Sequence, residues 1–154
     1  MLDNRPQDID ETLGHTFGFS SFRPRQREIV EAVLSGRDVF ATLPTGGGKS
    51  LCYQLPSTLL PGLTVVVSPL IALMEDQVTA ARQNGLAASF LNSSLDTAGF
   101  RQVLTEIESG QTSLLYVSPE RISAPQFREK LSTLDVSLFA IDEAAKIYQH
   151  ISGK

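Results

Sequence analysis

The residues best suited to do chemistry stand in the run L-P-T-G-G-G-K-S at positions 43–50. Its three consecutive glycines let backbone amides approach an anion without side-chain obstruction. Lys49 adds a compact cation for nucleotide phosphates, and Ser50 adds a hydroxyl that can ligate Mg²⁺. A helix that begins at Ser50 would direct its positive dipole end at the same anion. The spacing predicts a P-loop with contacts from Thr45, Gly46, Gly47, Gly48, Lys49 and Ser50.

One position departs from the general P-loop pattern, because Leu43 stands where that pattern has glycine. The rest of the spacing is as required, and an apolar run at positions 38–42 supplies the strand that should precede the loop. The alternative is a glycine-rich turn that precedes Lys49 and Ser50 by chance. The strand-loop-helix context favours the phosphate site.

A second acidic element follows another apolar run, since Asp142 and Glu143 come directly after positions 136–141. Ligand sites of open parallel sheets lie outside the carboxyl ends of the strands, which is where this pair is expected. Asp142 would hold the Mg²⁺ shell, and Glu143 would orient or deprotonate an attacking water. The alternative is an acidic pair that caps the next helix. With Lys49, the two carboxylates complete the expected catalytic set.

The elements that must position these residues alternate along the chain. Short apolar runs predict strands at 38–42, 64–68, 88–91, 114–117 and 136–141. Helical spacing predicts two crossover helices, through Leu73, Met74, Val78 and Ala81 and through Phe100, Val103, Leu104 and Ile107. We expect an N-terminal helix with Pro24 in its first turn. Its inner face should contain Ile29, Val30, Val33 and Leu34. The pattern predicts an α/β fold with a doubly wound, mainly parallel sheet.

Composition narrows the class of protein further. The 154 residues fit one soluble domain, with 42% hydrophobic and 19% charged residues. A net charge of −4 gives no global basic surface, so any nucleic-acid contact must be local. The single cysteine, Cys52, lies between Leu51 and Tyr53 and is expected to be a buried packing residue in a reducing cytoplasm. We expect neither export nor membrane insertion.

From about Leu13 to Glu143 the chain resembles the first RecA-like lobe of the RecQ family of superfamily 2 DNA helicases. The segment F-G-F-S-S-F-R-P-R-Q looks like that family's adenine-recognition motif, and the resemblance assigns base contacts to Phe19, Arg23 and Gln26. The hydrophobic residue at position 43 is also a family trait. The resemblance therefore implies ATP with Mg²⁺ as the ligand.

Three further segments resemble the family's nucleic-acid motifs in the right order, at positions 65–77, 91–95 and 115–121. A packing turn is the alternative reading of the first of them. The resemblance implies contacts to single-stranded or partly duplex DNA from Ser68, Pro69, Leu70, Gln77, Asn92, Ser93, Pro119, Glu120 and Arg121.

The resemblance weakens after the second Walker motif, which reads D-E-A-A with Ala145 where the family has histidine. We expect a single domain over 1–154, with the N-terminal helix and adenine motif at 8–36, the core at 37–143 and a divergent tail at 144–154. The family's second lobe and its arginine finger are not represented, so we expect slow hydrolysis and no unwinding by this chain alone. A disrupted or altered chain terminus is the favoured explanation for the loss of the family pattern after Ala144.

Three functions compete at this point. The first is a RecQ-type helicase lobe, with 3′ to 5′ polarity and roles in DNA repair and recombination implied by the family. The second is a non-catalytic nucleotide- or DNA-binding remnant that regulates a full-length motor. The third, a small P-loop kinase or an unrelated NTPase, is disfavoured by the ordered helicase motifs. The expected location is the cytoplasm, at the nucleoid in a bacterium, or the nucleus in a eukaryote.

Overall fold

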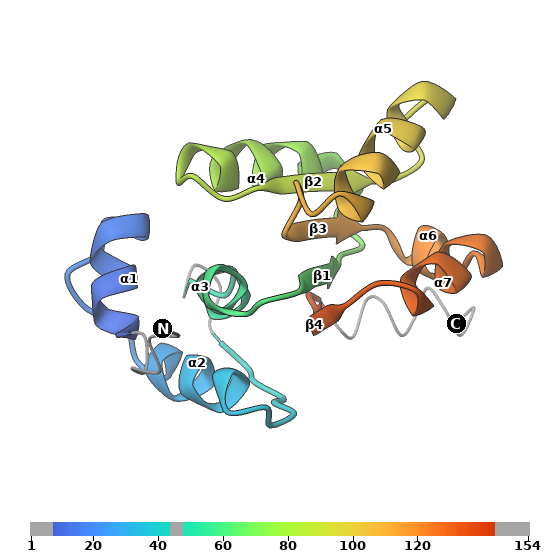
Figure 1. Cartoon of the computed structure of the whole chain (residues 1–154). Helices are drawn as coiled ribbons and strands as arrows, with labels where there is room; N and C mark the ends of the chain where they lie inside the picture. Colours follow the sequence, from blue (N-terminus) through green and yellow to red (C-terminus); the bar gives the residue numbers. More distant parts are fainter. Residues whose placement is uncertain (1–7, 44–47, 144–154) are drawn as a thin grey trace, which may run out of the picture. The chain divides into compact units, whose positions relative to one another are not determined.

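The computed structural model describes residues 8–43 and 48–143. The chain divides into two compact units, Met1–Leu60 and Pro61–Lys154, whose elements are labelled in Figure 1. None of the described helices is both long enough and apolar enough to cross a membrane.

The first unit contains three helices, α1 (Ile9–Phe17), α2 (Gln26–Leu34) and α3 (Leu51–Leu59). Its core joins one buried face from each helix and consists of Leu13, Val30, Leu51 and Leu55. The carboxylate of Asp8 caps the start of α1 by accepting from the Asp10 amide at 2.9 Å. The sequence did not predict α1. Pro24 lies in the turn before α2 and not in its first helical turn.

The strand expected at positions 38–42 is wrong, because residues 37–43 form no regular structure and pair with no strand among the described residues. Two apolar side chains of this segment, Val39 and Phe40, are 40% and 90% exposed. The high β propensity of Val and Phe means that their side chains pack well on a half-buried pleated surface. Without a neighbouring strand, that propensity does not fix the backbone.

The second unit contains a four-stranded parallel sheet with strand order β2-β3-β1-β4. The strands are β1 (Leu63–Val67), β2 (Ala88–Leu91), β3 (Leu114–Val117) and β4 (Val136–Ile141). The predicted 64–68 strand is therefore shifted by one residue, and the other three expected strands have the predicted bounds.

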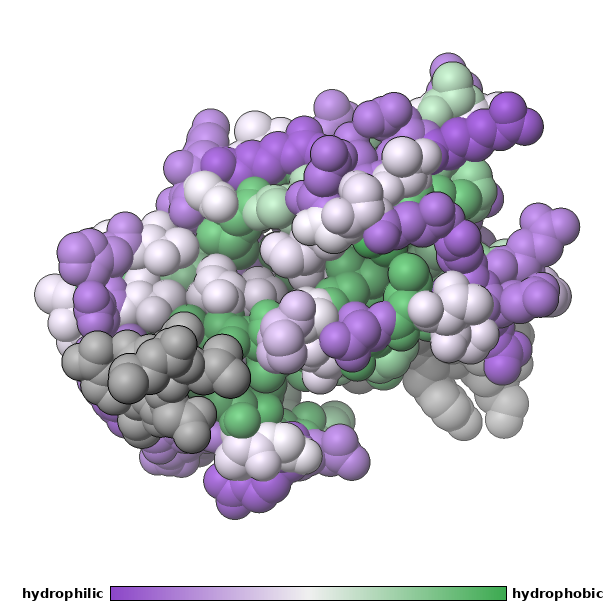
Figure 2. All heavy atoms as spheres, viewed as in Figure 1, coloured by the Kyte–Doolittle hydropathy of each residue, from purple (hydrophilic) through white to green (hydrophobic). Residues whose placement is uncertain are grey.

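Helices α4 (Ile71–Gln83) and α5 (Thr97–Glu108) connect consecutive strands, and α6 (Pro119–Ser123) and α7 (Pro125–Ser132) lead into β4. The β1-to-β2 and β2-to-β3 connections run in opposite directions along the sheet, so right-handed crossovers place α4 and α5 on opposite faces. The core on the α5 side joins Ile107, Phe127 and Leu131 to the strands. Hydrophilic residues cover most of the surface over α4 and α5 in Figure 2. The doubly wound parallel fold is confirmed.

Strand β4 is an edge strand that pairs with β1 and with no other strand in the described part of the chain. Phe139 and Ile141 are 55% and 59% exposed. They lie opposite Val65 and Val67 in register, on the same face as the core beneath α5. Among the described residues, the apolar core on that face therefore does not extend over these two side chains of β4.

Candidate functional site

The P-loop is described from Gly48 onward, whereas Thr45, Gly46 and Gly47 lie outside the described residues. Gly48 has a φ of +76°, which favours glycine. A Cβ atom built at this position would lie 2.2 Å from Nε2 of Gln26. The backbone conformation therefore favours glycine here, and a larger residue would also displace the Gln26 amide.

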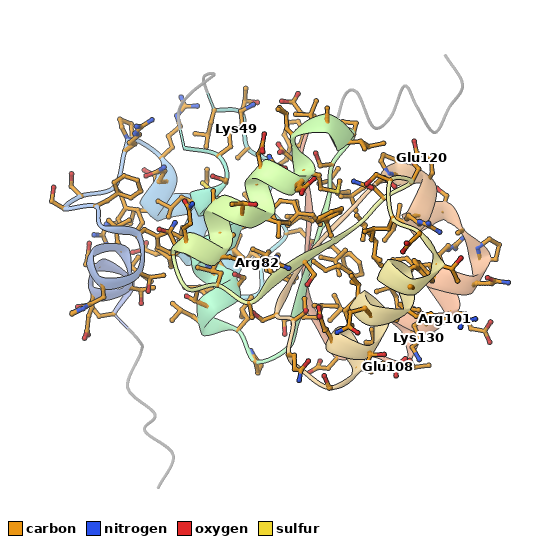
Figure 3. All side chains as sticks on the ribbon, turned by 90° about the horizontal axis from the view of Figure 1, so that it is seen from above. Lys49, Arg82, Arg101, Glu108, Glu120 and Lys130 are labelled. Atoms are coloured by element: carbon orange, nitrogen blue, oxygen red, sulfur yellow. The ribbon has the colours of Figure 1, made fainter. Side chains whose placement is uncertain are left out.

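Lys49 and Ser50 lie in the turn that leads into α3, and Lys49 is labelled in Figure 3. The helix begins at Leu51, one residue after the predicted start. Ser50 is the N-cap residue, yet its side chain makes no capping hydrogen bond, and the first turn of α3 carries no acidic residue. The exposed hydroxyl and the positive end of the helix are therefore both accessible to groups outside α3.

The donor set fits Mg²⁺ held mainly by a nucleotide. Among residues 8–43 and 48–143, no group of three or more His, Cys, Asp or Glu side chains could hold a metal ion. Mg²⁺ usually binds through one or two protein oxygens plus substrate phosphates and waters. The Ser50 hydroxyl and the Asp142 carboxylate are ligands of the appropriate hard-oxygen type.

Gln26 joins the expected adenine motif to the end of the P-loop. Its side chain is 2% exposed; the Oε1 atom accepts from the Arg23 amide at 2.8 Å, and Nε2 donates to the Gly48 carbonyl at 3.0 Å. Phe19 is 51% exposed, and the Arg23 side chain is also exposed. Base contact by Phe19 and Arg23 is sterically open, while Gln26 contacts the protein backbone.

Cys52 lies in the first turn of α3, and its Sγ is 4.0 Å from the Gly48 carbonyl oxygen. Burial raises the pKa of this thiol to about 11. The thiol is therefore protonated at neutral pH, and the expected role as a buried packing residue is confirmed.

The carboxyl edge of the sheet is built from polar residues that directly follow the strands. The amides of Asp142, Ser68 and Ser118 donate to the last carbonyl of the neighbouring strand, on Val67, Val117 and Leu91, at 2.9, 3.0 and 3.1 Å. This ladder fixes the Asp142 backbone at the carboxyl end of β4, where the sequence predicts it. The half-buried Glu143 follows it.

Two non-glycine residues in the described segments have positive φ, Arg25 at 73° and Glu143 at 54°. Such a conformation costs on the order of 1–3 kcal/mol and persists where the surroundings hold it. Arg25 lies within the expected adenine motif, and Glu143 is the expected water-orienting residue. The strained positions thus coincide with the segments that the sequence singles out.

Several residues of the expected nucleic-acid motifs are buried and shape turns. Ser68 is fully buried, and its Oγ accepts from the Leu70 amide at 3.2 Å. Asn92 is 2% exposed; its Oδ1 accepts from the Ser94 amide at 2.8 Å, and its Nδ2 lies 3.6 Å from the sulfur of Met74. Pro119 is also buried. In this conformation the three residues hold the backbone turns at the carboxyl edge of the sheet.

Other residues of the same motifs reach the surface. Ser93 and Glu120 are exposed, and Pro69, Leu70, Gln77 and Arg121 are half-buried. No side chain caps the N-terminus of α4, which follows Leu70 directly. The Gln77 Oε1 is buried and has no hydrogen-bond partner in the described part of the protein. Surface groups and an uncapped helix start therefore share this edge.

The family model described as "DEAD/DEAH box helicase" matches residues 23–153. The chain belongs to the DEAD/DEAH box helicase family. The match includes the P-loop, the polar carboxyl edge of the sheet and the Asp142–Glu143 pair. Within the family, the chain is homologous to RecQ helicases.

Curated relatives support that assignment. The chain is 48% identical over 137 residues to a probable ATP-dependent DNA helicase RecS of Bacillus subtilis, covering 88% of this chain and 27% of the relative. It is 47% identical over 137 residues to an ATP-dependent DNA helicase RecQ of Haemophilus influenzae, covering 89% and 22%. The chain thus spans about a quarter of the length of these helicases.

A solved structure shows the same fold at low sequence identity. The chain superposes on a hypothetical ATP-dependent RNA helicase from Sulfolobus tokodaii with a TM-score of 0.72 and 19% identity, covering 94% of this chain and 44% of the other. This likeness establishes a helicase RecA-like fold.

Two residues near the helicase motifs were not predicted from the sequence. Ser118 is fully buried, and its Oγ has no hydrogen-bond partner among the residues described. The Phe100 ring lies beneath the Arg121 guanidinium, with 4.6 Å from Cζ to the ring centroid. Phe100 was expected only as an inward-facing helix residue. Its pairing with Arg121 depends on a contact between segments about 20 positions apart, which periodicity does not report.

Proposed function

We propose that this chain is the ATP-binding lobe of a RecQ-type, ATP-dependent DNA helicase that acts in DNA repair and recombination with 3′ to 5′ polarity. The observation that carries the proposal is the glycine-dependent turn at Gly48, followed by Lys49 and Ser50 at the uncapped start of α3. Membership of the DEAD/DEAH box helicase family supports the same assignment.

In this proposal each residue has a defined task. Lys49 stabilises the β and γ phosphates, together with backbone amides from Thr45 to Gly48. Ser50 and Asp142 would hold Mg²⁺, which would supply positive charge beside the phosphates. Glu143 orients the attacking water or accepts its proton. The adenine base stacks on Phe19 and Arg23, and Gln26 contacts its edge after its bonds to the backbone rearrange.

Single-stranded DNA would lie along the carboxyl edge of β2, β3 and β1. Its phosphates would meet the uncapped N-terminus of α4, the exposed Ser93 and the Arg121 guanidinium. Ser68, Asn92 and Pro119 would act by holding the turns, and Pro69, Leu70, Gln77 and Glu120 by shaping the surface. A net charge of −4 is compatible with such a local site, whereas a broad basic surface for DNA would require an excess of Lys and Arg.

The 154-residue chain by itself should bind nucleotide and DNA without unwinding a duplex. Strand separation by these motors uses two lobes that close and open around ATP. A second candidate function is a non-catalytic regulator of a full-length helicase. The D-E-A-A sequence, with Ala145 in place of the family's histidine, favours that candidate.

Titration with fluorescent ATP, with and without Mg²⁺, tests the nucleotide site. Lys49→Ala should weaken binding by at least tenfold, because it removes a charge-assisted phosphate contact of about 1.5–3 kcal/mol. Lys130→Ala is the matched control: it removes the other lysine of the described residues, which pairs with Glu108 (Figure 3). Equal affinity of wild type and Lys49→Ala would refute the phosphate assignment.

ATP hydrolysis measured with and without single-stranded DNA separates the two candidates. DNA-stimulated hydrolysis that is lost in Glu143→Gln would support a motor lobe and refute the regulator. Nucleotide binding with no hydrolysis in either condition would favour the regulator.

A further inference from the structure

Arg121 is held in an unusual setting at the edge of the sheet. It lies on α6, just after Ser118 and Pro119, and its guanidinium lies over the ring of Phe100 from α5. Phe100 is half-buried and packs against the core beneath α5 and α7. The ring is therefore anchored to the core, and the cation lies on its outer side.

One face of the Arg121 guanidinium is stacked on the Phe100 ring, and its edge meets no carboxylate among the described residues. Within the residues that the structure describes, no carboxylate forms an ion pair with Arg121. The N–H donors of a guanidinium lie in its plane, so stacking on an aromatic ring leaves them available to an anion.

A second stacked arginine shows the contrast. Arg27 lies 4.9 Å from the Phe22 ring centroid, but its guanidinium also pairs with Asp10 and Glu31. Those carboxylates occupy donors of Arg27 and raise its pKa. Arg27 therefore has carboxylate partners within the first unit, whereas no carboxylate of the described residues pairs with Arg121.

We propose that Phe100 is a positioning residue for nucleic-acid binding: its ring holds the Arg121 guanidinium flat, so that the guanidinium edge meets a phosphate of single-stranded DNA. This inference rests on the proposed DNA-binding function. A stacked guanidinium loses less side-chain entropy when it binds a phosphate than a freely rotating one does, so the ring contributes affinity without touching DNA.

The position of the pair supports this role. The Ser118 amide bonds to the Leu91 carbonyl at 3.1 Å, which places the start of α6 beside the end of β2. The exposed Ser93 follows β2 two residues later. A phosphate at the Arg121 edge would therefore lie close to a second polar group from the neighbouring turn.

The test measures binding of a fluorescein-labelled oligothymidine to the 154-residue chain by anisotropy at several salt concentrations. Arg121→Ala should reduce affinity and lower the slope of log K against log salt by about 0.7, the value for one phosphate contact on a single strand. Phe100→Leu should weaken binding about 2- to 5-fold, as expected from the loss of one cation–π contact. Phe100→Tyr, which keeps the ring, should retain wild-type affinity.

The decisive measurement is the double variant. Phe100→Leu should have no further effect on DNA affinity in the Arg121→Ala background, because the ring acts through the arginine. Arg101→Ala is the charge-matched control: it removes an exposed arginine from the same helix, adjacent to Phe100 but on a different side. It should change affinity less than Arg121→Ala does.

Other outcomes would overturn the inference. A merely structural role for Phe100 predicts a lower melting temperature, with equal affinity losses in the wild-type and Arg121→Ala backgrounds. If Arg121→Ala weakens binding and Phe100→Leu does not, the positioning role fails while DNA binding by this edge stands. If wild type binds ATP but not the oligonucleotide, the DNA part of the proposed function fails together with this inference.

Discussion

Gly48 shows at the scale of single residues how the P-loop and the adenine motif constrain each other. Its carbonyl accepts from Nε2 of Gln26, and that same Nε2 occupies the space that a Cβ atom at position 48 would need. The side chain of Gln26 is almost fully buried and bonds the Arg23 amide at its other end. A substitution at position 48 that displaces Gln26 is therefore expected to disturb the hydrogen bond between Gln26 and the Arg23 amide.

Gly48→Ala should destabilise the protein by two separable amounts. The positive φ costs about 1–2 kcal/mol for an L-residue, and displacement of Gln26 removes a hydrogen bond of about 1 kcal/mol. Gly36→Ala provides the control, because Gly36 has a φ of +84° and no atom within 4 Å of a built Cβ. Urea unfolding should show the larger loss at position 48.

The contribution of Gln26 can be isolated with the double variant. Gln26→Ala should cost less in the Gly48→Ala background than in the wild type, since both substitutions remove the bond between Gln26 and the Gly48 carbonyl, while the bond to the Arg23 amide is lost with Gln26 alone. Fully additive effects, or equal losses at positions 36 and 48, would contradict the coupling.

The sequence predicted where Lys49 and Ser50 lie, in the turn before α3, because a few adjacent residues specify that turn. The backbone contacts of Gln26 and the ring under Arg121 were not predictable, since each depends on segments about 20 positions apart. A single sequence contains no direct record of such pairs.

At the scale of elements, the entry into β1 is a point of close backbone approach. Gly62 donates its amide to Ser137 Oγ at 2.8 Å, and the β1–β4 register shifts between Leu63 and Thr64. A Cβ atom at position 62 would lie 2.5 Å from the Asp135 carbonyl oxygen and 2.6 Å from Ser137 Oγ. The first of these obstacles is backbone and cannot rotate away.

Gly62→Ala should therefore weaken the β1–β4 pairing and lower the free energy of unfolding by about 1–3 kcal/mol, the usual cost of overpacking. Gly14→Ala is the control, because a Cβ atom there meets only the Phe19 carbonyl oxygen at 3.9 Å. That change in the middle of α1 should be neutral or stabilising. Thermal melting followed by circular dichroism measures both; no loss at position 62 would mean that the two strands separate easily.

The elements were predicted unevenly, for physical reasons. Strands β2 and β3 are short apolar runs because residues on both of their faces are buried, and helices α4 and α5 show helical periodicity because each buries one face. Strand β4 is also an apolar run, although none of its residues is fully buried. Helix α6 has only five residues, too few for a helical period to be visible. The segment at 38–42 has the composition of a strand, but strand structure depends on a partner that composition does not supply.

At the scale of the whole molecule, the outer edge of β4, which pairs with no strand among the described residues, should influence behaviour in solution. Phe139 and Ile141 are exposed on this strand, an arrangement that favours edge-to-edge association between chains. A net charge of −4 opposes association only weakly.

Phe139→Glu should reduce self-association of the 154-residue chain, because it places a charge on the exposed edge strand. Sedimentation velocity at increasing protein concentration would measure the effect. Leu73→Glu is the control: Leu73 on α4 is 50% exposed, so the same charge is added away from β4. Equal effects of the two substitutions would attribute any improvement to net charge and not to the edge.

The ladder of amides at the carboxyl edge has a consequence for isotope exchange. The amide protons of Asp142, Ser68 and Ser118 are each closed off by a carbonyl of the neighbouring strand. Deuterium from solvent replaces them when that neighbour moves away, so each amide reports on a different junction between strands. Nuclear magnetic resonance can measure the three exchange rates separately. Each rate would report how often one pair of neighbouring strands separates at its carboxyl ends.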